Sequence, residues 1–133
     1  MGIVSVDASF STHHLRDAGE FLDSALDSYE AGRYKASSSS SCLSGIRSAD
    51  AVCVAELGKQ WSGEHAGAAG LLAQTSLRQA GVDLLSSFLQ AKNLTQYRTI
   101  LVTESMAKAL LDKAIELNEL ARAAVLRAGH PMP

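Results

Sequence analysis

The sequence predicts an all-α protein, an antiparallel four-helix bundle with one additional short helix. The chain has two prolines, Pro131 and Pro133, so no proline interrupts a helix before position 131. Aromatic residues make up 5% of the chain and β-branched residues rarely cluster, so a sheet lacks its usual material. With 133 residues, the chain corresponds to a single domain, 1–133, whose core we expect over about 13–128.

The first long helix is predicted over about 12–31. Apolar residues recur there at three- and four-residue steps, which defines one face of an amphipathic helix. They are Leu15, Ala18, Leu22, Ala25, Leu26 and Tyr29. Ser11 or Thr12 is expected to cap the start of this helix and Gly32 to end it.

The second helix is predicted over about 33–57, with Gly58 as its stop. It contains five consecutive serines, 37–41, which elsewhere suggest a linker. Apolar residues keep helical spacing on both sides, and small side chains let neighbouring helices approach closely, so we interpret the run as helix. Arg47 and Asp50 lie three residues apart and are expected to pair with each other.

Two further helices follow. A short helix is predicted between Trp61 and Thr75, capped by Ser62 and with Glu64 in its first turn. A third long helix is predicted over about 77–92. Its inner face is formed by Val82, Leu85, Phe88 and Leu89.

The last helix is predicted from a cap at Thr103 to about position 128, where Gly129 closes it. Glu104 is well placed against the dipole of this helix. The apolar stripe is wide, which suits a helix that touches two neighbours, or one neighbour and a second subunit. Its positions include Ala107, Leu110, Ala114, Leu117, Ala121 and Ala124.

Charge and cysteine content narrow the class of protein. The net charge of −2 argues against a general nucleic-acid coat or a membrane-surface protein. Residues 1–31 carry six acids and a single arginine, a distribution expected of a solvated helix face. Cys42 and Cys53 are expected to be buried thiols. We see no signal peptide and no apolar run of membrane length, so the expected location is the cytoplasm.

Metal and nucleophile chemistry are weakly supported. His13 and His14 are adjacent, so on a helix they diverge and are poorly placed to hold one ion. We therefore expect neither a metal nor another cofactor. No Gly-x-Ser-x-Gly or phosphate-loop motif occurs, and the Ser105–Lys108 pair lacks the companion motifs of its enzyme class.

The polar stretch between the third and last long helices, Lys92 to Tyr97, is the best candidate site. Lys92 can hold a phosphate, Asn93 can orient it, and Tyr97 can donate a proton or stack on a base. Arg98 adds a second charge, and His65 is a further candidate ligand residue. Capping and packing roles remain the alternative for all of these residues.

Several segments, in this order, are similar to a known pattern. The pattern consists of the turn Tyr29 to Ala36, the small-residue stretch from Arg47 to Gly58, Glu64-His65 with Leu71-Leu72, Lys92 to Tyr97, and the Ala/Leu-rich final helix after Thr103. Together they resemble the HEPN family of small bacterial and archaeal helical bundles, with an actinobacterial subgroup the nearest.

The resemblance implies a ribonuclease motif whose residues are altered in this chain. HEPN ribonucleases carry an arginine, a polar residue and a histidine. By this resemblance Lys92 would stand at the arginine position, Asn93 at the polar one and Tyr97 at the histidine, so two of the three differ. A phenol is a weak substitute for imidazole at neutral pH. The likeness thus implies a homodimer with a nucleotide- or RNA-facing cleft, a nucleotidyltransferase-type partner or a toxin–antitoxin-like system, and no robust ribonuclease activity.

Three hypotheses follow from the sequence. The first is a noncatalytic or degenerate HEPN-like bundle that acts as a dimeric binding or regulatory module. The second is a weak or altered metal-independent ribonuclease. The third is a helical adaptor whose acidic first helix docks a basic protein.

Overall fold

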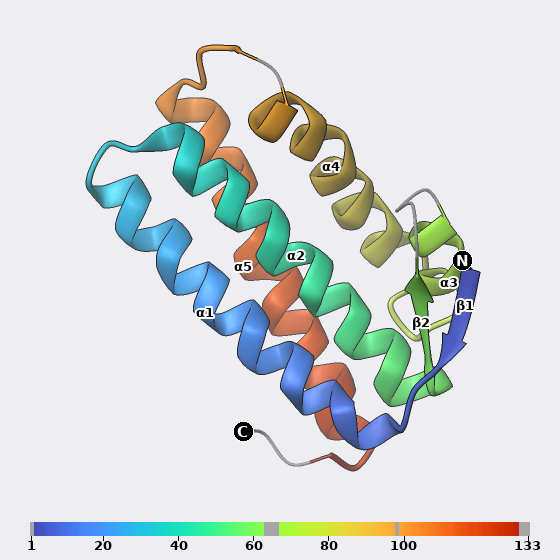
Figure 1. Ribbon diagram of the computed structural model, residues 1–133. Helices are drawn as coiled ribbons and strands as arrows, with labels where there is room; N and C mark the ends of the chain where they lie inside the picture. The colour runs from blue at the N-terminus through green and yellow to red at the C-terminus, as the bar shows by residue number, and fades with distance from the viewer. Residues whose placement is uncertain (1, 63–66, 98, 131–133) are drawn as a thin grey trace.

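The computed structural model describes residues 2–62, 67–97 and 99–130, with the backbone alone for positions 96 and 97 (Figure 1). The fold is 78% helix, which confirms the predicted helical class. The described elements are β1 (Gly2–Ser5), a 3-10 turn η1 (Ala8–Phe10), α1 (Ser11–Glu30), α2 (Tyr34–Leu57), β2 (Lys59–Ser62), α3 (Ala68–Leu72), α4 (Arg78–Tyr97) and α5 (Glu104–Arg127).

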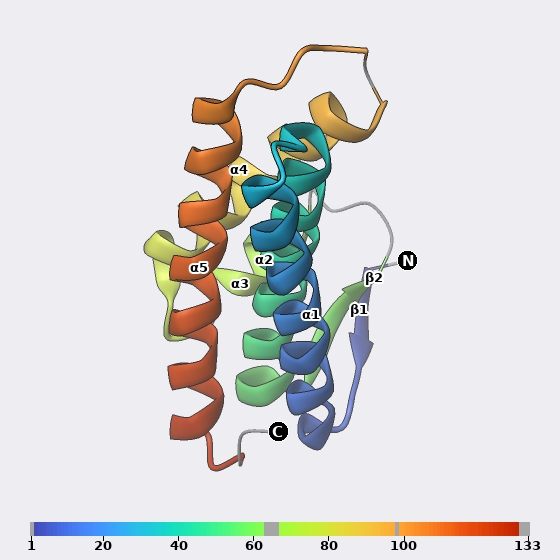
Figure 2. The ribbon, with the colours of Figure 1, turned by 90° about the vertical axis from the view of Figure 1, so that its left-hand side faces the viewer.

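Helix α2 lies at the centre of the molecule. It contacts α1, α4 and α5 along its length and β2 and α3 near its C-terminal end (Figures 1 and 2). Its residues are therefore buried on several sides, which small side chains permit because they let the neighbouring backbones approach. The buried positions are Ser37, Ser38, Ser41, Cys42, Ser44, Gly45, Ile46, Ser48, Ala49, Ala51, Val52, Cys53, Val54 and Ala55.

The serine run is helical, as predicted, and part of it faces α1. The Ser37 hydroxyl donates a hydrogen bond of 2.7 Å to the Ala25 carbonyl oxygen. Seven residues on, the Ser44 hydroxyl donates one of 2.7 Å to the Ala18 carbonyl oxygen. The two alanines are also seven residues apart, so the same contact repeats every two turns along an antiparallel pair of helices. These buried hydroxyls thus join α2 to α1 without the width of a larger side chain.

The predicted end of the third long helix is wrong. The prediction stopped at about 92, whereas α4 continues to Tyr97, so Lys92 and its neighbours form the final turns of a helix and are not a polar junction. Neither glycine nor proline interrupts 90–97, and the Thr95 hydroxyl donates to the Ala91 carbonyl oxygen at 3.0 Å within the helix. The polar side chains of 92–95 therefore belong to the helix and do not mark its end.

The short sheet was not predicted. β1 and β2 pair antiparallel, with Gly2 opposite Ser62 and Ser5 opposite Lys59. Ser62 therefore ends a strand and does not cap the short helix, whose N-cap is Gly67. Glu64, expected in the first turn of that helix, lies outside the described residues. The pairing joins segments almost sixty residues apart, so local sequence patterns do not reveal it.

The helix ends agree with the predictions at most positions. Gly32, Gly58 and Gly129 have positive φ values of 76°, 63° and 91° where helices end. The Thr103 hydroxyl accepts from the Met106 N–H at 3.3 Å and caps α5. The predicted cap of α1 is wrong, because the 3-10 turn η1 leads directly into a helix that begins after Phe10.

Helix α5 has two principal neighbours, as one of the sequence alternatives predicted. It packs mainly on α2 and α1 and touches α4 at fewer positions. The buried residues are Ala107, Leu111, Ala114, Leu117, Asn118, Ala121, Ala124 and Val125. A contact with a second subunit stays a prediction. Among the described helices, none is long and apolar enough to cross a membrane.

Candidate functional site

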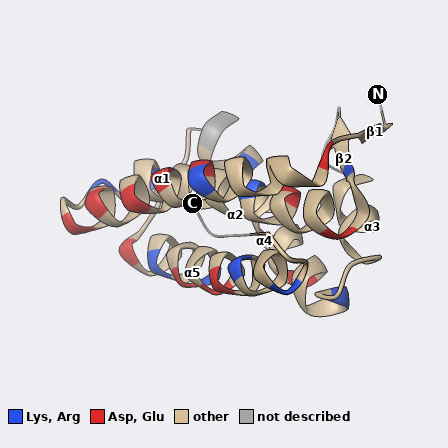
Figure 3. Ribbon diagram, turned by 90° about the horizontal axis from the view of Figure 1, so that it is seen from below, with Lys and Arg blue, Asp and Glu red and all other residues tan. Residues whose placement is uncertain are grey.

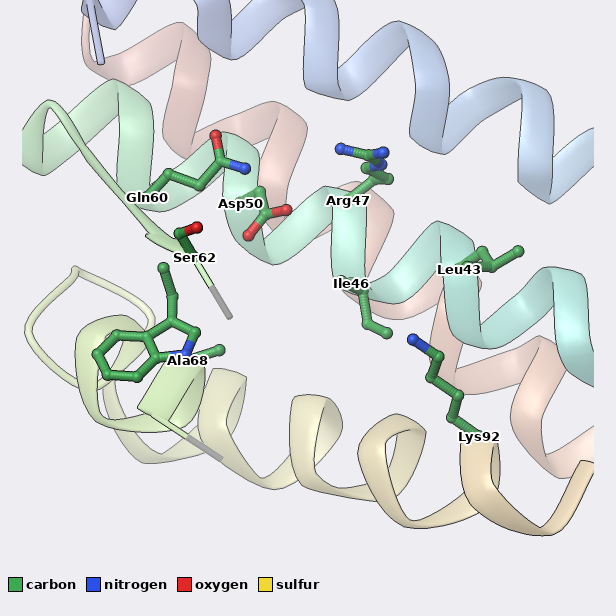
Figure 4. Close-up of a pocket in the computed structure, with 9 residues that line it drawn as sticks. Leu43, Ile46, Arg47, Asp50, Gln60, Ser62, Ala68 and Lys92 are labelled. Atoms are coloured by element: carbon green, nitrogen blue, oxygen red, sulfur yellow. The ribbon is translucent and has the colours of Figure 1, made fainter. Parts of the chain in front are cut away.

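A cavity of about 360 Å³ lies between the central helix α2, strand β2 and helices α3 and α4 (Figure 4). It is lined by Leu43, Ile46, Arg47, Asp50, Gln60, Trp61, Ser62, Ala68 and Lys92. The size is that of a small-molecule pocket. Five of the nine lining residues are polar or charged, namely Arg47, Asp50, Gln60, Ser62 and Lys92.

Two cationic side chains reach this cavity from different helices. Arg47 extends from α2, and Lys92 extends toward α2 from α4 (Figure 4). Arg47 is half-buried in the fold, and so is Lys92. A guanidinium and an ammonium at one cavity provide hydrogen-bond donors for phosphate or carboxylate oxygens.

Asp50 lies on α2 at the same cavity, three residues after Arg47. Burial disfavours its ionised form and raises the pKa of this carboxyl from 3.8 to about 7, while the positive charge of Arg47 acts in the opposite direction. The carboxyl therefore exchanges its proton close to neutral pH. An Arg47–Asp50 ion pair stays a prediction, whereas both residues line the cavity and the charge of Arg47 acts on the carboxyl.

The third wall is the short strand β2, held in place through Gln60. The His14 ring Nε2, on α1, donates to the Gln60 side-chain oxygen at 3.0 Å. Burial lowers the pKa of His14, and the nearby charge of Arg47 lowers it further. His14 is consequently neutral at physiological pH, and its role at the edge of the site is to position Gln60.

Trp61 forms the apolar part of the same wall. Its ring lies directly against the backbone of Gly67, where an added Cβ would stand 2.1 Å from Trp61 Cζ2. A glycine is thus needed at position 67 for the indole to occupy this place. Because this is the only tryptophan of the chain, its indole N–H resonance is a single probe at the wall of the cavity.

The structure separates the residues of the predicted site. Lys92 lines the cavity, but the neighbouring Asn93 is exposed and is not among the residues that border it. Consecutive residues on a helix diverge by about 100°, so the continuation of α4 explains the separation. Tyr97 ends α4, but its side chain lies outside the described part of the chain, as do Arg98 and His65.

Sequence reasoning missed four residues of this site. Arg47 and Asp50 were interpreted as a pair, although charges on a helix of otherwise small residues were a usable indication of a polar cavity. Gln60 and Trp61 carried no such indication, because their place depends on β2 pairing with β1.

Other polar groups of the chain lie elsewhere. Acidic residues recur along α1 (Figure 3), and Glu20, Asp23, Asp27 and Glu30 among them are exposed. Burial raises the pKa of the Cys42 thiol to about 12, and that of Cys53 to about 12 as well, so neither is a ready nucleophile. Within residues 2–62, 67–97 and 99–130, no three histidine, cysteine or carboxylate side chains gather in a metal-binding arrangement.

No protein-family model matches the chain, and no curated protein matches it.

Proposed function

We propose that this chain is a noncatalytic, HEPN-like antiparallel four-helix bundle that acts as a binding or regulatory module for a small phosphate-bearing ligand of the nucleotide class. Four long helices, α1, α2, α4 and α5, support the bundle architecture, with β2 and α3 in the connection between α2 and α4. One observation carries the ligand class: Arg47 and Lys92 line the same cavity as Trp61. Two cations match a phosphate group, and an indole offers a ring for a base.

A binding role fits the described cavity better than RNA cleavage does. Metal-independent cleavage needs one group to take a proton and another to return it. Among the described residues that line the cavity, only Asp50 has a pKa close to neutrality. Asn93 is exposed and does not line the cavity, so it does not join Lys92 there.

Calorimetric titration with adenosine 5′-monophosphate (AMP) tests this function. We expect Arg47→Ala and Lys92→Ala each to weaken binding about tenfold or more, since a charge-assisted hydrogen bond contributes about 1.5–3 kcal/mol. Arg122→Ala is the matched control, because it removes one positive charge from an exposed position on α5. Absence of binding to the wild type, or equal affinity in all three variants, would reject the proposed function.

The noncatalytic part of the proposal has its own test. A fluorogenic RNA incubated with the purified protein should remain uncleaved, at the level of a buffer control. Cleavage that disappears in both Lys92→Ala and Tyr97→Phe would instead establish the altered ribonuclease.

The proposed assembly is a homodimer, with a nucleotidyltransferase-type partner as a further candidate. Exposed apolar side chains near the α4–α5 connection, Leu94, Leu101 and Met106, support a contact at that end of the molecule. Leu101 is 86% exposed. Sedimentation should give a dimer for the wild type and a monomer for Leu101→Asp, and a monomeric wild type at micromolar concentration would reject this assembly.

A further inference from the structure

Asp50 is the only acid among the described residues that line the cavity, and it shares the cavity with two cations. With its carboxyl ionised, the formal charge of Arg47, Lys92 and Asp50 together is +1. With the carboxyl protonated, it is +2. A ligand that brings two negative charges is therefore matched only by the protonated cavity.

We infer that Asp50 determines the ligand charge that the cavity accepts: protonated, it admits a phosphate dianion, and ionised, it admits a monoanion. This inference rests on the proposed binding of a phosphate-bearing ligand. It makes Asp50 a specificity-determining residue and predicts the number of protons taken up with each bound dianion. When a dianion binds at a pH where Asp50 is ionised in the free protein, one proton passes from the solvent to the Asp50 carboxyl. No covalent bond of the ligand changes.

The surroundings of Asp50 support this role. The titratable and charged groups of the described elements around Asp50 and the cavity are His14 on α1, Arg47 and Cys53 on α2, and Lys92 on α4. Burial, and then the charge of Asp50, raises the pKa of the Cys53 thiol to about 12, so this thiol stays protonated between pH 7 and pH 9. The described parts of β2 and α3 that line it contribute no titratable side chain, and Glu64 and His65 lie outside the described residues.

The proton exchange of Asp50 falls in a useful range. Burial holds its pKa at about 7, against the lowering effect of Arg47. The pKa of His14 is lowered from 6.5, so this ring stays neutral above pH 7. The phosphate of AMP has its second pKa near 6 and is already a dianion in the same range. Between pH 7 and pH 9, Asp50 is thus the described group of the cavity whose charge changes most.

Two adenine nucleotides of different charge provide the test. AMP is a dianion above pH 7, whereas cyclic 3′,5′-AMP carries a single negative charge. If the dianion binds only the protonated cavity, its apparent Kd rises with the ionised fraction of Asp50, roughly 50-fold from pH 7 to pH 9. The Kd of cyclic AMP should change by less than about threefold over the same range.

Asp50→Asn separates this effect from other consequences of pH. Asparagine has the same shape and cannot ionise, so we expect the Kd of AMP to stay within about threefold between pH 7 and pH 9 in this variant. Asp112→Asn, at an exposed position on α5, should retain the wild-type dependence on pH. Calorimetry of the wild type at pH 8 in two buffers of different ionisation enthalpy measures proton uptake directly, and does so even if Asp50→Asn fails to fold.

The outcomes distinguish this inference from the proposed function. Wild-type protein that binds neither nucleotide at any pH overturns both. Wild-type protein that binds AMP with equal affinity at pH 7 and pH 9, or without proton uptake at pH 8, overturns the role of Asp50 and leaves the binding function standing. Equal pH dependence in Asp50→Asn and the wild type also overturns it.

Discussion

The contact between Gly45 and Phe88 holds α4 against the central helix and thereby sets the place of Lys92. A Cβ added at Gly45 would stand 2.3 Å from Phe88 Cε2 and 2.4 Å from Phe88 Cδ2. The Phe88 side chain is fully buried, so its ring has no free space into which to withdraw. Lys92 lies one turn beyond Phe88 on α4, so a displaced ring moves the helix that carries this cation.

The magnitude follows from two opposing effects. Inserting a methyl group into a filled core costs about 1–3 kcal/mol, and the upper value applies because the short contacts are with a rigid ring. Alanine gains about 1 kcal/mol over glycine inside a helix. We therefore expect Gly45→Ala to lower the free energy of unfolding by about 2 kcal/mol. It should also weaken AMP binding, since α4 is displaced.

Gly19→Ala is the matched control. A Cβ at this position of α1 meets nothing within 4 Å, so the helix preference acts alone and stability should rise by about 0.5–1 kcal/mol. Urea denaturation followed by circular dichroism measures both variants. Phe88→Leu should be less harmful in Gly45→Ala than in the wild type, because a smaller side chain relieves the clash. If Gly45→Ala and Gly19→Ala were equally stable, the packing argument would be refuted.

Three further predictions concern buried groups. Ser44→Ala should lower the free energy of unfolding in urea by about 1 kcal/mol, because it removes the hydrogen bond to the Ala18 carbonyl oxygen. Ser41→Ala should be neutral or stabilising, because the Ser41 hydroxyl has no hydrogen-bond partner in the described structure. The reverse order of stability would contradict this prediction. Cys42 and Cys53, each with a pKa raised to about 12, should react with an aromatic disulfide reagent at pH 8 far faster in denaturant than in the native state, and rapid native labelling would contradict their burial. Folding raises the pKa of Asp50 from 3.8 to about 7, so ionisation of this carboxyl opposes folding. The stability of the wild type should therefore fall between about pH 4 and pH 7 relative to that of Asp50→Asn. Melting temperatures that stay parallel for the two proteins over this range would contradict this prediction.

Local sequence patterns predicted most of the helical framework because they depend on near neighbours. Gly58 adopts φ of 63° and ends α2, and Thr103 caps α5, as residue preferences alone indicate. The serines of α2 were recognisable as helix because apolar residues keep the period on both sides. The C-terminal extent of α4 was not predicted, since Lys92 to Tyr97 are mostly polar residues, which a helix accommodates as readily as a loop does.

The candidate site depends on contacts that are distant in sequence. Lys92 was identified for its charge, but its partners come from α2 and β2, more than thirty residues earlier. Trp61 reaches the cavity wall because β1 pairs with β2 and because Gly67 leaves room for its ring. Neither condition is visible in a short window of sequence. Asp50 also required the fold, because its raised pKa results from burial, which the carboxylate alone does not reveal.

The central claim is that a phosphate-bearing ligand occupies the cavity beside Trp61. The indole N–H of this single tryptophan gives one resonance in a proton–nitrogen correlation spectrum, which can be followed while AMP is added. The account predicts that this resonance shifts and saturates with the Kd obtained by calorimetry, and that Lys92→Ala requires about tenfold more AMP for the same shift. An indole resonance that stays in place while AMP binds would contradict it.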